Sequence, residues 1–317
     1  MKKIFCLCLA CLLAGLFCAC GSQLPLVCIS QYGEHASLDN CREGFLAGLA
    51  QAGLAEGVDF EVDYQNAGFN DAMATQIAQS FTARSAALMC GIATPSAQAC
   101  YNEGRESGIP TVFVAVTDPQ EAKLTSGNVT GTSDRLPVEG QLKLIRQLQP
   151  EAKTVGVIYS SGEANSVSAI REYEALTPQY GFTLKAVAVT AQSEVSQALD
   201  KLLSDGVDCL SNLTDNGVVG VLDMILEKTG EAGIPVYGSE IEQVRKGCVA
   251  GAGIDYFALG KQTGAMAAKI LKGEATAEAL PYETISEYGL YLNSAAVEKL
   301  GLTVPASLAA SAEQVGK

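Results

Sequence analysis

The sequence predicts an α/β protein made of two doubly wound parallel-sheet lobes joined by a multi-strand hinge. The chain has 317 residues, 48% of them hydrophobic, so it can bury a large core and is too long for one typical domain. Short apolar, β-branched runs alternate with helical patterns, as in parallel sheets covered by helices on both faces. A polar segment, residues 117–139, separates two rounds of this alternation.

The middle segment follows an apolar run, Thr111 to Val116, that has the composition of a buried parallel strand. Asp118-Pro119 ends this strand, because proline removes a ladder donor and fixes φ. Ligands of open α/β sheets bind outside the carboxyl ends of the strands. We therefore expect this segment to link the lobes and also to contribute to a site, through Thr117, Asp118, Ser133 and Asp134.

The first round of alternation begins at residue 24. Strands are expected at 24–30, 60–64, 86–92 and 111–116. Ser37 is predicted to cap the first helix, Asp71 to open the second, and Thr94 to cap the third with Pro95 at its first position.

The second round repeats this plan, with strands expected at 154–159, 182–189 and 207–213. The stretch 106–113 parallels 231–237, which indicates matching lobes. A glycine-rich run then precedes a helix after Asp255, a last strand at 288–292 and a short helix capped by Asn293. The chain is expected to recross between the lobes, which gives lobe 1 as 24–132 with 252–284 and lobe 2 as 133–251 with 285–312.

Glycines in two short motifs invite a nucleotide-binding interpretation, which we reject. Gly251-Ala252-Gly253 lacks the third glycine of a dinucleotide fingerprint, and Gly260-Lys261-Gln262 lacks the spacing of a phosphate loop. Both are interpreted as packing glycines. Gly127, Gly131, Gly251 and Gly253 are expected either to flex in a hinge or to form tight turns.

Residues 1–20 have the features of a lipoprotein signal peptide. Met1-Lys2-Lys3 precedes an apolar run, Ile4 to Phe17, that is short for a membrane span. The sequence up to Cys20-Gly21-Ser22 resembles a bacterial lipobox, so Cys20 is the predicted site of lipidation. The protein is expected to be extracytoplasmic and lipid-anchored to the bacterial cell membrane.

Composition excludes several function classes. A formal charge of −14, from 21 basic and 35 acidic residues, argues against nucleic acid as a partner. A single histidine and no C-x-x-C pair after the signal region argue against a metal site or a catalytic triad, so no enzyme activity and no cofactor are predicted. Six cysteines follow the signal region, and most are expected to be reduced core residues.

Polar loops follow the predicted strands in both lobes. Singly, many of these residues are ordinary helix caps, but six such loops in two facing lobes predict a wet cleft for a small zwitterion or carboxylate. The candidate ligand-binding residues are Tyr32, Glu34, His35, Thr94, Ser96, Thr117, Asp118, Asp134, Glu163, Asn165, Ser166, Asp215, Asn216 and Ser239.

Eight ordered motifs carry a resemblance to a known family. They are Glu34 to Asp39, Ala93 to Gln98, Val116 to Pro119, Asn128 to Gly131, Leu136 to Glu139, Ser161 to Ser166, Thr214 to Asn216 and Gly253 to Tyr256. In this order they resemble the ABC-transporter substrate-binding lipoproteins of the tryptophan/tyrosine-uptake type. The resemblance implies a type I periplasmic-binding-protein fold and delivery of an amino acid to an ABC permease and its ATPase. The stretch Tyr237 to Glu242 departs from the Gly-Asp-rich loop usual in the family.

An aromatic amino acid is the favoured ligand under this resemblance. Asp215 is the expected partner of its ammonium group, and Thr94 and Ser96 would hold its carboxylate at a helix N-terminus. Asn165, Ser166 and Asn216 would complete the pairing, with His35 or Tyr32 against the side chain. The alternatives are a sensing lipoprotein that presents ligand to a membrane receptor, and binding of another small polar solute.

Overall fold

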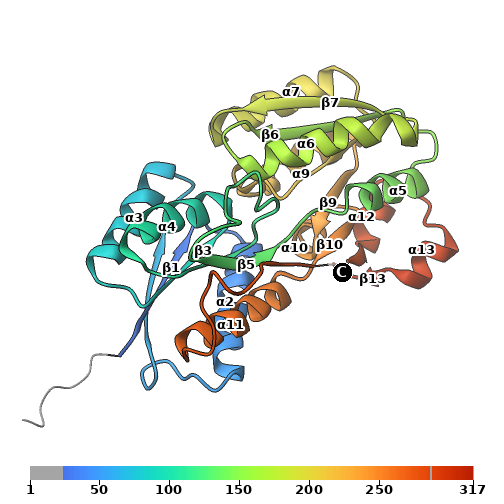
Figure 1. Ribbon diagram of the computed structural model, residues 1–317. Coiled ribbons are helices and arrows are strands. Elements are labelled where there is room, and N and C mark those ends of the chain that lie inside the picture. Colours follow the sequence, from blue (N-terminus) through green and yellow to red (C-terminus); the bar gives the residue numbers. More distant parts are fainter. Residues whose placement is uncertain (1–23, 286–287, 317) are drawn as a thin grey trace, which may run out of the picture.

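The computed structural model describes residues 24–285 and 288–316. The predicted signal peptide and Cys20 lie outside the described residues. Two sheets flanked by helices form two lobes (Figure 1). Within the described ranges, no helix is both long and apolar enough to cross a membrane.

The first lobe is built on a six-stranded parallel sheet with the order β11-β5-β4-β3-β1-β2. Its strands are β1 (Leu26–Gln31), β2 (Glu61–Asn66), β3 (Leu88–Ile92), β4 (Thr111–Val114), β5 (Val129–Ser133) and β11 (Glu283–Thr284). Its helices are α2 (Ala36–Gln51), α3 (Asp71–Ala83), α4 (Thr94–Ser107) and α11 (Tyr256–Leu271). The central strands β3, β4 and β5 are buried throughout; β3 and β4 are accordingly short, mostly apolar runs, whereas β5 buries the polar side chains of Thr130, Thr132 and Ser133.

Helices α2 and α11 pack side by side through facing glycines (Figure 1). A Cβ on Gly44 would lie 2.1 Å from the carbonyl oxygen of Phe257, and one on Gly260 would lie 2.1 Å from that of Cys41. Only glycine allows so close an approach of two backbones. The prediction that Gly260 is a packing residue is confirmed.

The second lobe is built on a seven-stranded sheet with the order β13-β12-β10-β9-β8-β6-β7, in which β12 is antiparallel to β10. Its strands are β6 (Thr154–Ser160), β7 (Thr183–Val189), β8 (Cys209–Ser211), β9 (Val236–Glu240), β10 (Ala250–Ile254), β12 (Gly289–Leu292) and β13 (Glu313–Gln314). Its helices are α5 (Val138–Leu148), α6 (Ala164–Leu176), α7 (Val195–Ser204), α8 (Asn216–Val219), α9 (Leu222–Ala232), α10 (Ile241–Lys246), α12 (Ser294–Lys299) and α13 (Ala306–Ser311). Short 3₁₀ helices lie at Thr177–Tyr180 and Gln192–Glu194.

The chain passes between the sheets three times, after β5, after β10 and after β11. β10 pairs with both β9 and β12, so the second sheet extends past residue 251. Strands β5 and β10 and helix α10 were not among the sequence-based expectations.

The glycines expected near the crossings have packing roles. A Cβ on Gly131, in β5, would lie 2.0 Å from the carbonyl oxygen of Phe113, and one on Gly253, in β10, would lie 1.7 Å from that of Ser239. Gly127 has φ = 80° in a turn. Close strand pairing requires glycine at Gly131 and Gly253, so the packing interpretation of Gly251-Ala252-Gly253 is confirmed, whereas the expected hinge movement of these glycines stays a prediction.

All six cysteines of the described chain are free and buried. Burial raises the pKa of each thiol, and for Cys28 and Cys100 it raises the pKa to about 12. The prediction of reduced core cysteines is confirmed.

Candidate functional site

The lobes contact each other on both sides of the cleft between them. On one side, the Ser168 hydroxyl in α6 donates to the Asp118 carboxylate at 2.7 Å, and Arg171 pairs with Glu121 at 3.1 Å. On the other side, the Asn40 amide in α2 donates to Glu242 in α10 at 3.1 Å. These bonds hold the two lobes close together at the rim.

Between the lobes lies a small cavity of ≈ 10 Å³. It is lined by His35, Ser37, Leu38, Ala115, Asp134, Thr214, Asn216, Val219, Glu240, Gln243 and Tyr256. The first lobe and its crossing segments supply about half of this lining, and the second lobe supplies the rest. A volume of this size accommodates a single hydroxyl-sized group.

Two buried carboxylates line the cavity. Asp134 accepts hydrogen bonds from the Thr117 hydroxyl at 3.0 Å and from Tyr256, and burial raises its pKa. Glu240 caps α10 by accepting from the backbone N–H groups of Glu242 and Gln243, and burial raises its pKa to about 7. The oxygens of both carboxylates therefore already have protein donors.

A second acidic pair, Glu163 and Asp215, lies at the N-termini of α6 and α8. Asp215 accepts from the backbone N–H and the hydroxyl of Ser160, the hydroxyl of Ser166 and the backbone N–H of Val218, at 2.6–2.9 Å. The Asp215 carboxylate thus holds β6, α6 and α8 together and is fully occupied. The prediction that Asp215 binds a ligand ammonium group is revised for this reason.

Glu163 is the more available member of this pair. Its Oε2 accepts from the Asn165 amide and from the amide and backbone N–H of Asn216, while its Oε1 accepts only from the backbone N–H of Gly217, at 3.2 Å. Burial, together with the neighbouring Asp215 carboxylate, raises the pKa of Glu163. Two carboxylates buried side by side repel each other, so a cation bound beside them would stabilise their charged forms.

In residues 24–285 and 288–316, no lysine or arginine side chain pairs with these buried carboxylates. No lysine or arginine nitrogen there lies within 4.0 Å of the carboxylates of Asp134, Glu163, Asp215 or Glu240. Buried charges in proteins are ordinarily paired or bound to a cationic ligand. The cleft is therefore suited to a positively charged group.

The first lobe favours a negatively charged group, because the N-termini of α2 and α4 carry the positive ends of their helix dipoles. The N-cap residues are His35 and Ala93, and neither side chain caps its helix, which corrects the prediction that Ser37 and Thr94 are the caps. Thr94 is instead the first residue of α4, and its buried hydroxyl has no partner among the described residues. Ser96 accepts from the Ser30 hydroxyl at 3.1 Å. An uncapped helix N-terminus with a free hydroxyl is suited to an anion.

Three aromatic rings of the first lobe gather at the cleft. Phe69 packs edge-on against Tyr32, with ring centroids 6.0 Å apart, and its ring is parallel to that of His35 at 6.4 Å. The Tyr32 hydroxyl donates to Asp71 at 2.8 Å, so its polar end faces away from the aromatic group. A Cβ on Gly220 of the second lobe would lie 3.2 Å from the Phe69 ring, which shows that these rings reach the opposite lobe.

Several predicted site residues have other roles. Glu34 is exposed and is not among the residues that line the cavity. Ser239 is occupied within the second lobe, between the Gln141 amide at 2.7 Å and the carbonyl oxygen of Asn212. Asp118 belongs to the rim contact with Ser168.

Sequence reasoning missed Phe69, Gln243 and Tyr256, and it placed Glu240 in one of the six polar loops without naming it as a candidate residue. Phe69 follows a glycine in a loop and has φ = 59°, a conformation that no sequence pattern distinguished. Tyr256 stands in one of the family motifs quoted above, which was the one available signal for it.

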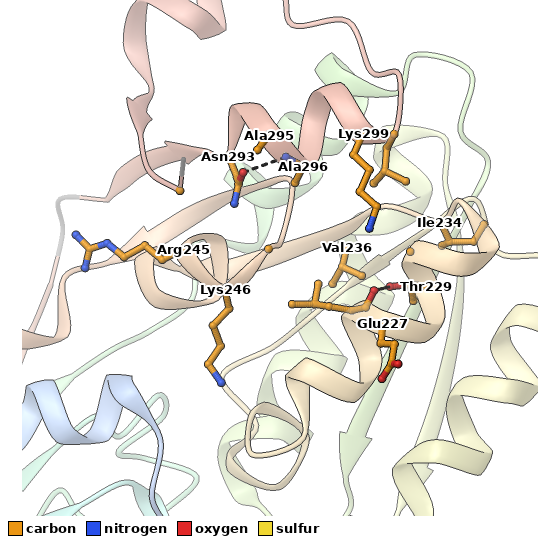
Figure 2. A pocket seen from close by; sticks show the side chains of 15 residues that line it. Glu227, Thr229, Ile234, Val236, Arg245, Lys246, Asn293, Ala295, Ala296 and Lys299 are labelled. Atoms are coloured by element: carbon orange, nitrogen blue, oxygen red, sulfur yellow. Dashed lines mark hydrogen bonds between the residues drawn. The ribbon is translucent and has the colours of Figure 1, made fainter.

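A pocket of ≈ 480 Å³ lies elsewhere in the second lobe, between α9, α10 and α12. Figure 2 shows Lys299 directed into it, while the side chains of Arg245 and Lys246 point away. Arg245 and Lys246 pair instead with Glu242 and Asp223. Because its polar groups do not converge, this pocket is a weaker candidate than the cleft.

Comparison with known proteins agrees with this geometry. Residues 26–316 match the family described as ABC transporter substrate binding protein. The chain belongs to this family. It is 36% identical over 281 residues to the tyrosine-binding protein of Clostridioides difficile (strain R20291), covering 86% of this chain and 80% of that protein. The two-lobed α/β fold and the substrate-binding role expected from the sequence are confirmed.

Two solved structures of this substrate-binding family differ in how well they superpose. The ABC domain in complex with L-Trp from Streptococcus pneumoniae has a TM-score of 0.88 at 30% identity, covering 92% of this chain and 100% of that chain. The ligand-free, open structure of a substrate binding protein with adhesive properties from Clostridium difficile has a TM-score of 0.68 at 32% identity, covering 93% and 100%. At similar sequence identity, this structure superposes better on the L-Trp complex than on the ligand-free, open structure.

Proposed function

We propose that this protein is the extracytoplasmic solute-binding component of an ABC importer, which binds an aromatic amino acid between its lobes and delivers it to a membrane permease and its ATPase. The observation that carries the proposal is the opposite charge preference of the two cleft faces. The second lobe presents buried carboxylates that lack a cation in the described chain, and the first lobe presents uncapped helix N-termini. A zwitterion satisfies both faces at once, and only when the lobes are closed.

The ammonium group is assigned to Glu163. Its Oε1 has one protein donor, whereas the oxygens of Asp215 together have four. An ammonium group against Oε1 would form a charge-assisted hydrogen bond and offset the repulsion between the two carboxylates. Asp215, Asn165, Ser166 and Asn216 then act by holding Glu163 and its loop in place.

The carboxylate is assigned to the N-terminus of α4. Pro95 has no N–H, so the backbone N–H groups of Thr94 and Ser96, together with the helix dipole, favour an anion there, and the unpartnered Thr94 hydroxyl offers a further donor. Ser96 lies one turn into the same helix and is held by Ser30.

The side chain is assigned to the aromatic group of Tyr32, His35 and Phe69. Aromatic pairs of this geometry contribute about 0.5–1.5 kcal/mol beyond the burial of their area. The named ligands of the similar proteins, tyrosine and L-Trp, are aromatic amino acids, which supports the same class of ligand for this chain.

Isothermal titration calorimetry on the mature protein tests the proposal. L-tyrosine or L-tryptophan should bind without turnover and raise the melting temperature. At a free ligand concentration about 100 times the dissociation constant, binding should stabilise the folded protein by about 2.7 kcal/mol. Tyramine lacks the carboxylate and 3-(4-hydroxyphenyl)propionate lacks the ammonium group, so each should bind far more weakly than tyrosine. If tyramine binds as tightly as tyrosine, the assignment of the ligand carboxylate to the α4 N-terminus is wrong. Chemical conversion of any ligand would contradict the non-enzymatic function.

Membrane anchoring through a lipid on Cys20 is part of the proposal. The motif before Gly21-Ser22 supports it. The Cys20→Ser variant should move from the membrane fraction to the soluble fraction while its ligand affinity stays unchanged. A membrane-bound Cys20→Ser protein would contradict this anchor.

A further inference from the structure

The single histidine of the chain has an unusual environment. His35 is half-buried as a residue, but both of its ring nitrogens are buried and lack a hydrogen-bond partner among the described residues. The Asn216 side chain is close enough to act on the pKa of His35, but no hydrogen bond of normal geometry joins it to either ring nitrogen. Burial lowers the pKa of His35 to about 4, so the ring is neutral at physiological pH, with one donor and one acceptor. An unsatisfied buried polar group costs about 1–3 kcal/mol.

The cavity beside His35 has a matching size and character. It is lined by polar side chains from both lobes, and its ≈ 10 Å³ suits the tip of a side chain rather than the charged end of an amino acid. The Asp134 and Glu240 oxygens there are already hydrogen-bonded, which leaves the His35 nitrogens as the unpaired groups. On the aromatic side, the His35 ring is parallel to that of Phe69.

We propose that His35 determines specificity by hydrogen-bonding a polar atom on the ligand's aromatic side chain, so that the cleft prefers tyrosine or tryptophan to phenylalanine. This inference rests on the proposed function. The main-chain groups of the ligand have their own partners, Glu163 for the ammonium group and the α4 N-terminus for the carboxylate. A phenolic hydroxyl can either donate to or accept from a neutral imidazole, and an indole N–H can donate to it. A phenyl ring leaves both nitrogens unpaired, and sites built for such a bond reject the analogue that lacks it.

Calorimetry with three ligands tests this. The wild-type protein should bind tyrosine or tryptophan about 10- to 100-fold more tightly than phenylalanine, the size expected from one buried hydrogen bond. His35→Phe keeps an aromatic ring and removes both nitrogens, so it should abolish that preference while phenylalanine binds at least as well as before. Asp39→Asn, in the first turn of the same helix but outside the cavity, is the matched control and should keep the wild-type preference.

A second measurement uses the fact that the chain has one histidine. In ¹⁵N-labelled wild-type protein, the imidazole nitrogen signals belong to His35 alone. Saturation with tyrosine or tryptophan should shift them strongly, and saturation with phenylalanine should not. This readout decides the question even where His35→Phe fails to fold.

The outcomes separate the two proposals. Equal wild-type affinity for tyrosine, tryptophan and phenylalanine overturns the role of His35 but leaves the amino-acid function intact. An equal loss of all three ligands in His35→Phe also overturns it, because His35 would then hold a main-chain group. Absence of binding by any amino acid sinks the proposed function itself.

Discussion

Replacing Glu163 with glutamine should weaken ligand binding and stabilise the ligand-free protein at the same time. Glutamine has nearly the same shape, and its carbonyl oxygen can keep the hydrogen bonds from the Asn165 and Asn216 amides. What the Glu163→Gln change removes is the negative charge beside Asp215. The charge is useful when an ammonium group is bound and unfavourable when none is.

The two effects have different sizes. Removing one partner of a buried charge pair costs about 2–5 kcal/mol of affinity, which corresponds to a dissociation constant raised about 30- to 5,000-fold. In the ligand-free protein, relief of repulsion in a site whose burial already raises the pKa of Glu163 should add on the order of 1 kcal/mol, or about 2–4 °C in melting temperature. The new amide faces the N–H of Gly217, which limits this gain.

Calorimetry and thermal unfolding of Glu163→Gln measure both effects, with Asp215→Asn as the matched comparison. Asp215→Asn should lower stability as well as affinity, because the four donors around Asp215 lose an acceptor. Wild-type affinity in Glu163→Gln would refute the assignment of the ammonium group. A destabilised Glu163→Gln would show that Glu163, like Asp215, is mainly structural.

Three further predictions concern pH, closure and the thiols. The pKa of Glu240 is raised from 4.5 to about 7, so its contribution to stability is greatest below pH 4.5 and is lost as the pH rises through 7. The free energy of unfolding should therefore fall by up to about 3 kcal/mol over this pH range. Urea unfolding at about pH 5 and about pH 8 should show this fall in the wild type and not in Glu240→Gln. Removing the rim contact in Asp118→Ala with Ser168→Ala should increase the radius of gyration of the ligand-free protein in small-angle scattering, and saturating ligand should restore it; an unchanged radius would contradict the rim's role in closure. The six buried thiols should resist a thiol reagent in the folded protein and react completely in denaturant; rapid labelling of the folded protein would contradict their burial.

Sequence patterns predicted the architecture because buried strands consist mainly of apolar residues. Strands β1, β3 and β4 lie inside the sheet, so their residues form continuous apolar runs that stand out from the flanking polar loops. β10 escaped prediction because close approach to β9 requires glycine at positions 251 and 253, and glycine lowers any strand signal. Helix α10 escaped because it has only six residues.

The site was predicted at the level of loops rather than of atoms. The sequence places Glu163 and Asp215 after strands of the second lobe, and both were candidates. It does not show that four donors converge on Asp215 while one oxygen of Glu163 has a single donor, because those donors come from β6, α6 and α8 and meet only in the folded chain. For the same reason Phe69 went unnoticed, since its neighbours His35 and Gly220 are distant in sequence.

The unpaired groups of the cleft follow from the need to bind a polar solute reversibly. A site whose carboxylates, hydroxyls and imidazole were all satisfied by the protein would gain stability and would have nothing left to offer a ligand. In this protein Asp215, Asp134 and Glu240 are satisfied and position the loops, whereas Glu163 Oε1, the Thr94 hydroxyl and the His35 nitrogens are among the groups left with few partners or none. Each unmet group costs stability in the ligand-free protein and favours the ligand by a similar amount. A zwitterion with a polar aromatic side chain meets all three together, which is why closure around it should be selective as well as tight.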